Sequence, residues 1–132
     1  MFVRTITPRV SETNLTGHVG HSAVPVWLEE GYAEILRLFS ENPAEPALIM
    51  VNINIDYLRE IFFGRDVRIE TGVKKVGRTS LVLGQELFQE GALCVRSETT
   101  FVHFDYKRRR PLPIPPAIRP ILEGHLTPRE ET

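Results

Sequence analysis

The spacing of hydrophobic residues changes along the chain, and each change marks an expected element. Residues 2–10 alternate loosely between apolar and polar side chains, which predicts a first β-strand with Pro8 near its end. From residue 24 onwards, apolar residues recur every three or four positions, as on one face of a helix: Val24, Leu28, Gly31, Ile35 and Leu38. Ser22 is a candidate N-cap, and Pro25 is tolerated only in the first turn of a helix. We therefore predict one long helix over residues 22–40.

Long alternating segments follow this helix, over residues 48–58, 66–76, 80–88 and 92–106. Gly77 marks a turn between the second and third of them, and residues 89–91 indicate a hairpin before the last. A basic, proline-rich tail begins near residue 107 and leaves room for only a short helical turn over residues 117–122. This order of elements predicts an α+β domain, in which a curved antiparallel sheet of about five strands wraps around one long central helix.

The segment around residues 51–56 suggests that the protein associates with itself. Its apolar residues alternate with Asn52, Asn54 and Asp56, so one face of the strand is polar. A single sheet covering a single helix leaves a sheet edge open, and association is a common way to cover such an edge. We therefore expect a homodimer at least, with a homotetramer as the larger alternative.

Composition narrows the possible classes of protein. The 132 residues fit one domain over residues 1–132, and a net charge of −1 gives no reason to expect binding to nucleic acid or to a membrane surface. The single cysteine, Cys94, excludes an internal disulfide framework, and no Cys/His cluster has the spacing of a zinc site. Neither a signal peptide nor an apolar run of membrane-spanning length is present. These observations predict a cytoplasmic protein without a bound metal.

The segment from Ser11 to Tyr32 reads SETNLTGHVGHSAVPVWLEEGY. It resembles the 4-hydroxybenzoyl-CoA thioesterase-like branch of the hotdog-fold acyl-CoA thioesterases, in which a D-x-x-G-H/V-V stretch precedes an aromatic-rich helix containing E-E-A-R. Further matches follow in the family's order: IDYL at 55–58, GRDV at 64–67, GRTS at 77–80 and RPLP at 110–113. The resemblance implies a hotdog fold and hydrolysis of an acyl-CoA substrate, aliphatic or aromatic, without a cofactor.

The resemblance also implies a site at the start of the helix. There a backbone N–H, near His21 in this chain, would polarise the thioester carbonyl. The position of the family's loop aspartate carries Asn14, which cannot accept a proton at neutral pH but can hold a water or the thioester. Another hotdog branch pairs a loop asparagine with a helix carboxylate about two turns beyond that amide. This points to Glu29 as base or nucleophile, with Glu30 as second choice, since both lie about 130° from the apolar stripe.

Other residues are candidates for binding the substrate. In the loop these are Gly17, His18 and Val19. In the GRTS turn, Arg78 with Thr79 and Ser80 is the expected site for the phosphates of coenzyme A. Lys74, Lys75, Arg65 and the basic run at 107–110 are further cations that would add to it. Cys94 lies within a predicted strand and is expected to be a small buried hydrophobic residue.

Several alternatives stay open. The two glutamates are also what a solvated helix face contains, and both loop histidines are also explained by hydrogen bonds to the backbone. A hydratase or dehydratase on the same fold would need His18 or His21 as its base. A non-catalytic acyl-thioester-binding protein would be consistent with the missing loop aspartate.

Overall fold

The computed structural model describes residues 1–14, 17–40, 42 and 45–126. In chain order, its elements are β1 (Phe2–Ile6), the 3₁₀ helix η1 (Val10–Glu12), α1 (Ala23–Gly31), α2 (Ala33–Phe39), β2 (Leu48–Tyr57), β3 (Val67–Val76), β4 (Ser80–Gln89), β5 (Ala92–Asp105), β6 (Arg110–Pro111) and α3 (Arg119–Glu123). The predicted strands are thus found within a few residues of their expected bounds. The exception is the first, which ends at Ile6 and gives way to η1 beyond Pro8.

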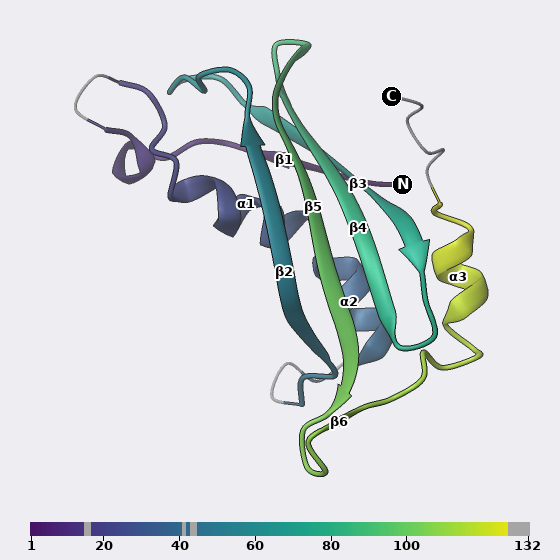
Figure 1. Ribbon diagram of the computed structural model, residues 1–132. Coiled ribbons are helices and arrows are strands. Elements are labelled where there is room, and N and C mark those ends of the chain that lie inside the picture. Colours follow the sequence, from purple (N-terminus) through teal and green to yellow (C-terminus); the bar gives the residue numbers. More distant parts are fainter. Residues whose placement is uncertain (15–16, 41, 43–44, 127–132) are drawn as a thin grey trace.

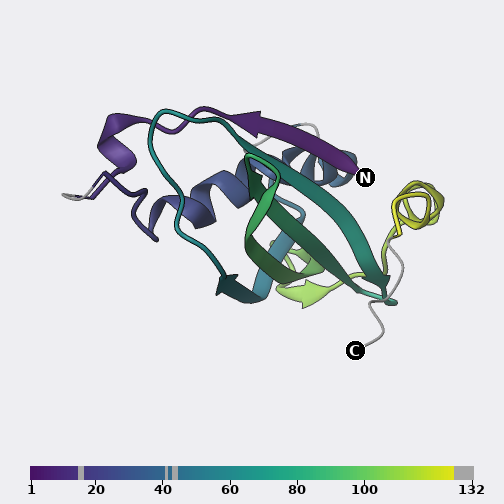
Figure 2. The ribbon, with the colours of Figure 1, turned by 90° about the horizontal axis from the view of Figure 1, so that it is seen from above.

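The strands form one antiparallel sheet in the order β1-β3-β4-β5-β2, with the short β6 added to β5. Figures 1 and 2 show this sheet strongly twisted and curled, with α1 and α2 on one of its faces. The turn between β4 and β5 contains Glu90 at φ 51° and Gly91 at φ 78°, a pair of positive φ values typical of a tight hairpin turn. The curved antiparallel sheet and the predicted hairpin are both confirmed.

The helical region differs from the prediction, because residues 22–40 do not form one long helix. α1 ends at Gly31, α2 begins at Ala33, and Tyr32 between them has φ −107° and ψ 11°. The N–H of Ile35 donates to the Tyr32 carbonyl oxygen at 3.0 Å, three residues back, as in a tightened turn. Such a turn barely alters the spacing of apolar residues, so the periodicity did not reveal it.

Polar side chains of the sheet explain where the helix breaks. Thr71 Oγ1 donates to the Gly31 carbonyl oxygen at 3.0 Å, and Gln85 Nε2 donates to the Leu28 carbonyl oxygen at 2.8 Å. Both side chains are buried. A Cβ atom on Gly31 would lie 2.8 Å from Gln85 Nε2 and 2.9 Å from a methyl of Ile69. Glycine therefore lets the helix approach the sheet closely enough for its last carbonyl groups to bind these side chains.

The break divides the hydrophobic core into two clusters. Val24, Trp27 and Leu28 of α1 pack against one end of β3, β4 and β5. Tyr32 and Ile35 pack against the other end, where Leu122 of α3 joins them. Burying each large apolar side chain contributes about 1.5–3 kcal/mol, so both helices are held mainly by packing on the sheet.

The proline-rich tail follows the sheet end that carries the β3–β4 turn. The N–H of Ile114 donates to the Arg78 carbonyl oxygen at 2.8 Å, and Arg119 Nη2 donates to the Gly77 carbonyl oxygen at 2.7 Å. α3, which corresponds to the predicted short helical turn, lies beside β3 (Figure 1). Among the described residues, no helix is long and apolar enough to cross a membrane.

Candidate functional site

The loop between η1 and α1 is fastened to the connection between β2 and β3. The N–H of Val19 donates to the Ile61 carbonyl oxygen at 2.7 Å, and the N–H of Phe63 donates to the Gly17 carbonyl oxygen at 3.3 Å. Within the loop, Asn14 Oδ1 accepts the N–H of His18 at 3.2 Å, and the N–H of Asn14 donates to the His18 carbonyl oxygen at 2.7 Å. The predicted loop residues are therefore brought together, and Asn14 shapes the turn that contains them.

His18 has an acidic neighbour that the sequence did not indicate. Its Nε2 lies 3.3 Å from Glu60 Oε2, and its ring meets the ring of Phe62 edge to face at 4.9 Å between centroids. Glu60 belongs to the β2–β3 connection, so only the folded chain places it beside the loop. This contact fits a histidine that fastens the loop, while leaving its imidazole half-exposed.

The start of α1 presents two unused hydrogen-bond donors. The carbonyl oxygen of Gly20 accepts the N–H of Ala23 at 3.1 Å, which closes the turn before the helix. Ser22 occupies the N-cap position, yet its side chain makes no capping hydrogen bond. Within residues 1–14, 17–40, 42 and 45–126, the backbone N–H groups of His21 and Ser22 have no acceptor. They lie at the positive end of the helix dipole, where a partly negative oxygen is stabilised.

A cleft of about 360 Å³ borders this helix start. It is lined by Val19, His21, Val24, Tyr57, Leu58, Arg59, Glu60 and Ile61. The hydroxyl of Tyr57 donates to the His21 carbonyl oxygen at 2.8 Å, and burial raises the pKa of this phenol, so it stays protonated near neutral pH. Nothing in the sequence pattern indicated that Tyr57, at the end of β2, would lie against the helix start.

The structure separates the two candidate glutamates, which the periodicity could not do. Glu30 borders a hollow beside Arg9 and Trp27, on the helix flank that faces η1. Glu29 lies on the other flank near Tyr32, because each residue advances the helix by about 100°. Burial, assisted by the charge of Glu29, raises the pKa of Tyr32 to about 12. The Tyr32 ring contacts Phe101 of β5, so the flank of α1 that carries Glu29 is turned away from η1 and toward the β5 side of the sheet.

The predicted phosphate-binding turn lies far from the helix start of the same chain. Arg78, Thr79 and Ser80 are at the β3–β4 turn, and Figure 1 shows this turn at the opposite end of the sheet from the start of α1. Tyr57 pairs with Val95 at the far end of the strands. β3 has 10 residues, so at a rise of about 3.3 Å per residue roughly 30 Å separates the two ends. One chain therefore does not bring these two predicted parts of the site together.

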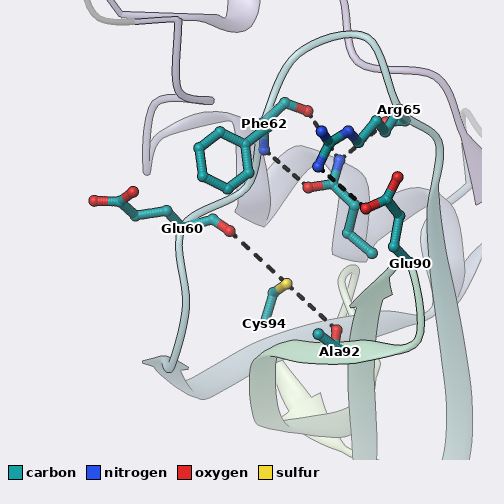
Figure 3. Close-up of polar contacts among 7 residues, drawn as sticks. Glu60, Phe62, Arg65, Glu90, Ala92 and Cys94 are labelled. Carbon is teal, nitrogen blue, oxygen red and sulfur yellow. Dashed lines mark hydrogen bonds and ion pairs between the residues drawn. The ribbon is translucent and has the colours of Figure 1, made fainter.

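Two further predicted cations, Lys74 and Arg65, have other side-chain neighbours. Lys74 lies along Gly84, on the sheet face where residues 54 and 56 also lie. Arg65 forms an ion pair with Glu90 at 3.1 Å, as Figure 3 shows. Arg65 therefore lies at the end of the sheet away from the β3–β4 turn, whereas Lys74 lies on β3 three residues before Gly77 of that turn.

Cys94 has the environment expected of a buried hydrophobic residue. It is 2% exposed, and its thiol contacts the carbonyl oxygen of Ala92 at 3.4 Å and that of Glu60 at 3.9 Å (Figure 3). Burial raises the pKa of this thiol, which disfavours the nucleophilic thiolate. Among the described residues, no cluster of His, Cys, Asp or Glu could hold a metal ion.

One edge of the sheet is open and partly apolar. Among the described residues, β2 pairs with β5 alone, on one of its sides. Ile55 packs against the core, whereas Val51 and Ile53 are 57% and 38% exposed at alternate positions of the same strand. Successive side chains of a strand point to opposite faces, so Ile53 lies on the helix side of the sheet like Ile55, whereas a β-bulge between Met50 and Asn52 interrupts this alternation at Val51. Asn54 and Asp56 face the opposite side, as the alternation predicted.

Comparison with proteins of known structure places the fold among thioesterases. A structure described as a predicted thioesterase from Bacillus stearothermophilus is 37% identical, with 96% of each chain covered and a TM-score of 0.92. A thioesterase from Thermus thermophilus, complexed with coenzyme A and Zn, is 22% identical over 93% of this chain and 92% of its own, with a TM-score of 0.84. The 1,4-dihydroxy-2-naphthoyl-CoA thioesterase of Synechocystis is 16% identical over 92% of this chain and 94% of its own, with a TM-score of 0.80. The curled sheet and these neighbours fit a hotdog fold.

The sequence comparisons agree with this placement. The uncharacterised protein YsmA of Bacillus subtilis is 29% identical over 107 residues, which cover 76% of this chain and 71% of YsmA. The family model of the thioesterase-like superfamily matches residues 8–122, nearly the whole described chain. The match is to the superfamily and does not single out the 4-hydroxybenzoyl-CoA branch. The chain belongs to the thioesterase-like superfamily.

Proposed function

We propose that this protein hydrolyses the thioester bond of an acyl-CoA. The observation that carries the proposal is the pair of N–H groups of His21 and Ser22, which find no acceptor in the described part of the chain and lie at the positive end of α1 beside a cleft. Such donors stabilise the negative oxygen that develops when a thioester carbonyl is attacked. Membership of the thioesterase-like superfamily supports this use of the helix start, and the coenzyme A bound to the Thermus thermophilus relative supports the substrate class.

In the proposed reaction, the thioester carbonyl oxygen accepts a hydrogen bond from the N–H of His21. The Glu29 carboxylate removes a proton from a water molecule, whose oxygen attacks the carbonyl carbon. The resulting tetrahedral oxyanion collapses, the C–S bond breaks, and the proton held by Glu29 passes to the leaving sulfur. The products are a free acid and coenzyme A, and the carboxylate is regenerated.

We assign the base to Glu29 rather than Glu30 because the two occupy different flanks of α1. Glu30 faces Arg9 and η1, within its own subunit. Glu29 is on the flank turned toward the β5 side of the sheet, and the open edge strand β2, where a second subunit would lie, is the neighbour of β5. In this assignment Asn14 does not act as a base; it holds the loop turn through its hydrogen bonds with His18.

We further propose a homodimer formed through the β2 edges. Two copies related by a two-fold axis would pair this strand antiparallel, and would cover the exposed Val51 and Ile53. Antiparallel pairing also turns the opposite end of the second sheet toward the helix start of the first. Arg78, Thr79 and Ser80 of the second copy would then lie near His21 of the first and would bind the phosphates there. Within one chain, His21 and Arg78 are too far apart to share a substrate.

A panel of short-chain, long-chain and aromatic acyl-CoAs tests the proposed function. The expected result is release of free thiol from at least one class, measured with a thiol reagent. Binding without thiol release would contradict hydrolysis and favour a non-catalytic binding protein. Hydration of an enoyl-CoA without thiol release would instead favour a hydratase, with His18 or His21 as the base.

A further inference from the structure

Tyr57 makes a short contact that joins the open edge strand to the helix start. It is the last residue of β2, and its hydroxyl donates to the carbonyl oxygen of His21 at 2.8 Å. Its ring also meets the imidazole of His21 edge to face, with 6.5 Å between the ring centroids. Tyr57 and His21 both line the cleft beside α1.

The carbonyl of His21 and the N–H of Ser22 belong to the same planar peptide group. Any contact that fixes the direction of the carbonyl therefore fixes the direction of the N–H. The backbone N–H of Val24 reaches the same oxygen only at 3.4 Å, a long hydrogen bond, whereas the Tyr57 hydroxyl is well within the ordinary range. The orientation of the Ser22 N–H thus depends on Tyr57.

We propose that Tyr57 is a positioning residue that aims the Ser22 N–H at the thioester carbonyl oxygen, making it a second oxyanion donor beside the N–H of His21. This inference rests on the proposed thioesterase function. Tyr57 acts through the peptide group and not on the substrate. Oxyanion donors are useful only when they point at the place where charge develops, so a freely turning peptide loses much of its effect.

Tyr57→Phe tests the inference, with Tyr106→Phe as a matched control. Tyr106 also donates its hydroxyl to a backbone carbonyl, that of Leu48 at 2.9 Å, near the opposite end of β2. Both variants lose one hydroxyl and one hydrogen bond to the main chain. We expect kcat to fall about 10- to 100-fold in Tyr57→Phe with KM little changed, and kcat to stay within about twofold in Tyr106→Phe.

A purely structural role would lower the melting temperature of both variants and leave both kcat values unchanged, which would overturn the inference. A raised KM with unchanged kcat would overturn it as well, because Tyr57 would then bind the substrate directly.

An NMR measurement tests the inference independently of activity. The ¹³C resonance of the His21 carbonyl should move upfield in Tyr57→Phe and stay in place in Tyr106→Phe.

The same measurements distinguish failure of the inference from failure of the proposed function. If the wild type releases no thiol from any acyl-CoA, the proposed function and the role of Tyr57 in it both fall. If the wild type is active and the His21 resonance does not move in Tyr57→Phe, only the inference falls.

Discussion

At the residue scale, the departure from the family pattern at Asn14 decides how the loop is interpreted. The side-chain oxygen of Asn14 accepts the N–H of His18, an interaction that a carboxylate could also make. The residue therefore keeps a loop-shaping contact while lacking the ability to take a proton. The loop can thus retain its form without the aspartate that the resemblance to the 4-hydroxybenzoyl-CoA thioesterase-like branch implies at this position.

Two substitutions of Asn14 separate these roles. Asn14→Ala removes the acceptor for His18, and we expect kcat to fall by up to about tenfold as the loop loosens. Asn14→Asp keeps the acceptor and adds a carboxylate, so it should restore part of the activity of a Glu29→Gln protein. Steady-state thiol release measures both effects. Full activity in Asn14→Ala, together with no rescue by Asn14→Asp, would contradict this interpretation.

Tyr32 gives the protein a predictable response to high pH. Burial, with the charge of Glu29, raises its pKa from 10.0 to about 12. The unfolded chain loses this proton near pH 10, whereas the folded protein keeps it until about pH 12, so the free energy of unfolding falls as pH rises between these values. Urea unfolding across this range should show a shallower fall for Tyr32→Phe than for the wild type. Equal slopes would contradict the assigned pKa.

At the scale of elements, packing against the sheet decides which residue is tolerated at the break between α1 and α2, and it outweighs local helix propensity. Alanine favours a helix over glycine by about 1 kcal/mol, so propensity alone would stabilise Gly31→Ala. The added Cβ would, however, lie within 3 Å of Gln85 Nε2 and of an Ile69 methyl in a packed core. Crowding of this kind costs about 1–3 kcal/mol and outweighs the gain in propensity.

We therefore expect Gly31→Ala to lower the free energy of unfolding by about 1–2 kcal/mol. Chemical denaturation monitored by circular dichroism measures this change. Gly20→Ala is the matched control, since its added Cβ would lie 3.5 Å from the nearest backbone oxygen, an ordinary contact, and its effect should be small. A stabilised Gly31→Ala protein would show that the close approach of helix and sheet is unimportant.

The strands could be predicted from sequence because their alternation is a local property, and every long strand was found near its expected bounds. The break at Tyr32 could not, because it depends on Thr71 and Gln85, which are distant in the chain. The residues of the candidate site differ in the same respect: some could be predicted from the local sequence and others could not. The loop motif indicated Asn14, His18 and His21, whereas Tyr57 and Glu60 join them only through the packing of the β2–β3 connection.

At the scale of the whole molecule, the open β2 edge relates assembly to function. Two predicted parts of the site, the helix start and the β3–β4 turn, lie at opposite ends of one sheet (Figure 1). β2 exposes apolar side chains along the edge that a second copy would cover. A dimer paired through this edge would supply both parts to each site.

Charge placed on this edge should prevent dimerisation. Val51→Lys puts an ammonium group at an exposed position of the edge strand β2, and we expect it to convert the dimer into a monomer because the buried charge would be unpaired. Val3→Lys is the matched control, because Val3 is a similarly exposed valine, 49% against 57%, on the other edge strand β1. Light scattering at micromolar concentration measures the mass. A monomeric wild type, or a dimeric Val51→Lys protein, would contradict the assembly.

If Glu29, about two turns beyond the start of α1, activates water for thioester hydrolysis, the paired variants Glu29→Gln and Glu30→Gln test this role most directly. Glutamine keeps the size of the side chain but cannot take a proton. On the acyl-CoA that the wild type cleaves fastest, kcat for thiol release should fall about 10²- to 10⁴-fold in Glu29→Gln, with KM and melting temperature little changed. Glu30→Gln should keep kcat within about threefold, since Glu30 faces η1 on the other flank of the helix. Near-full activity in Glu29→Gln would contradict this role.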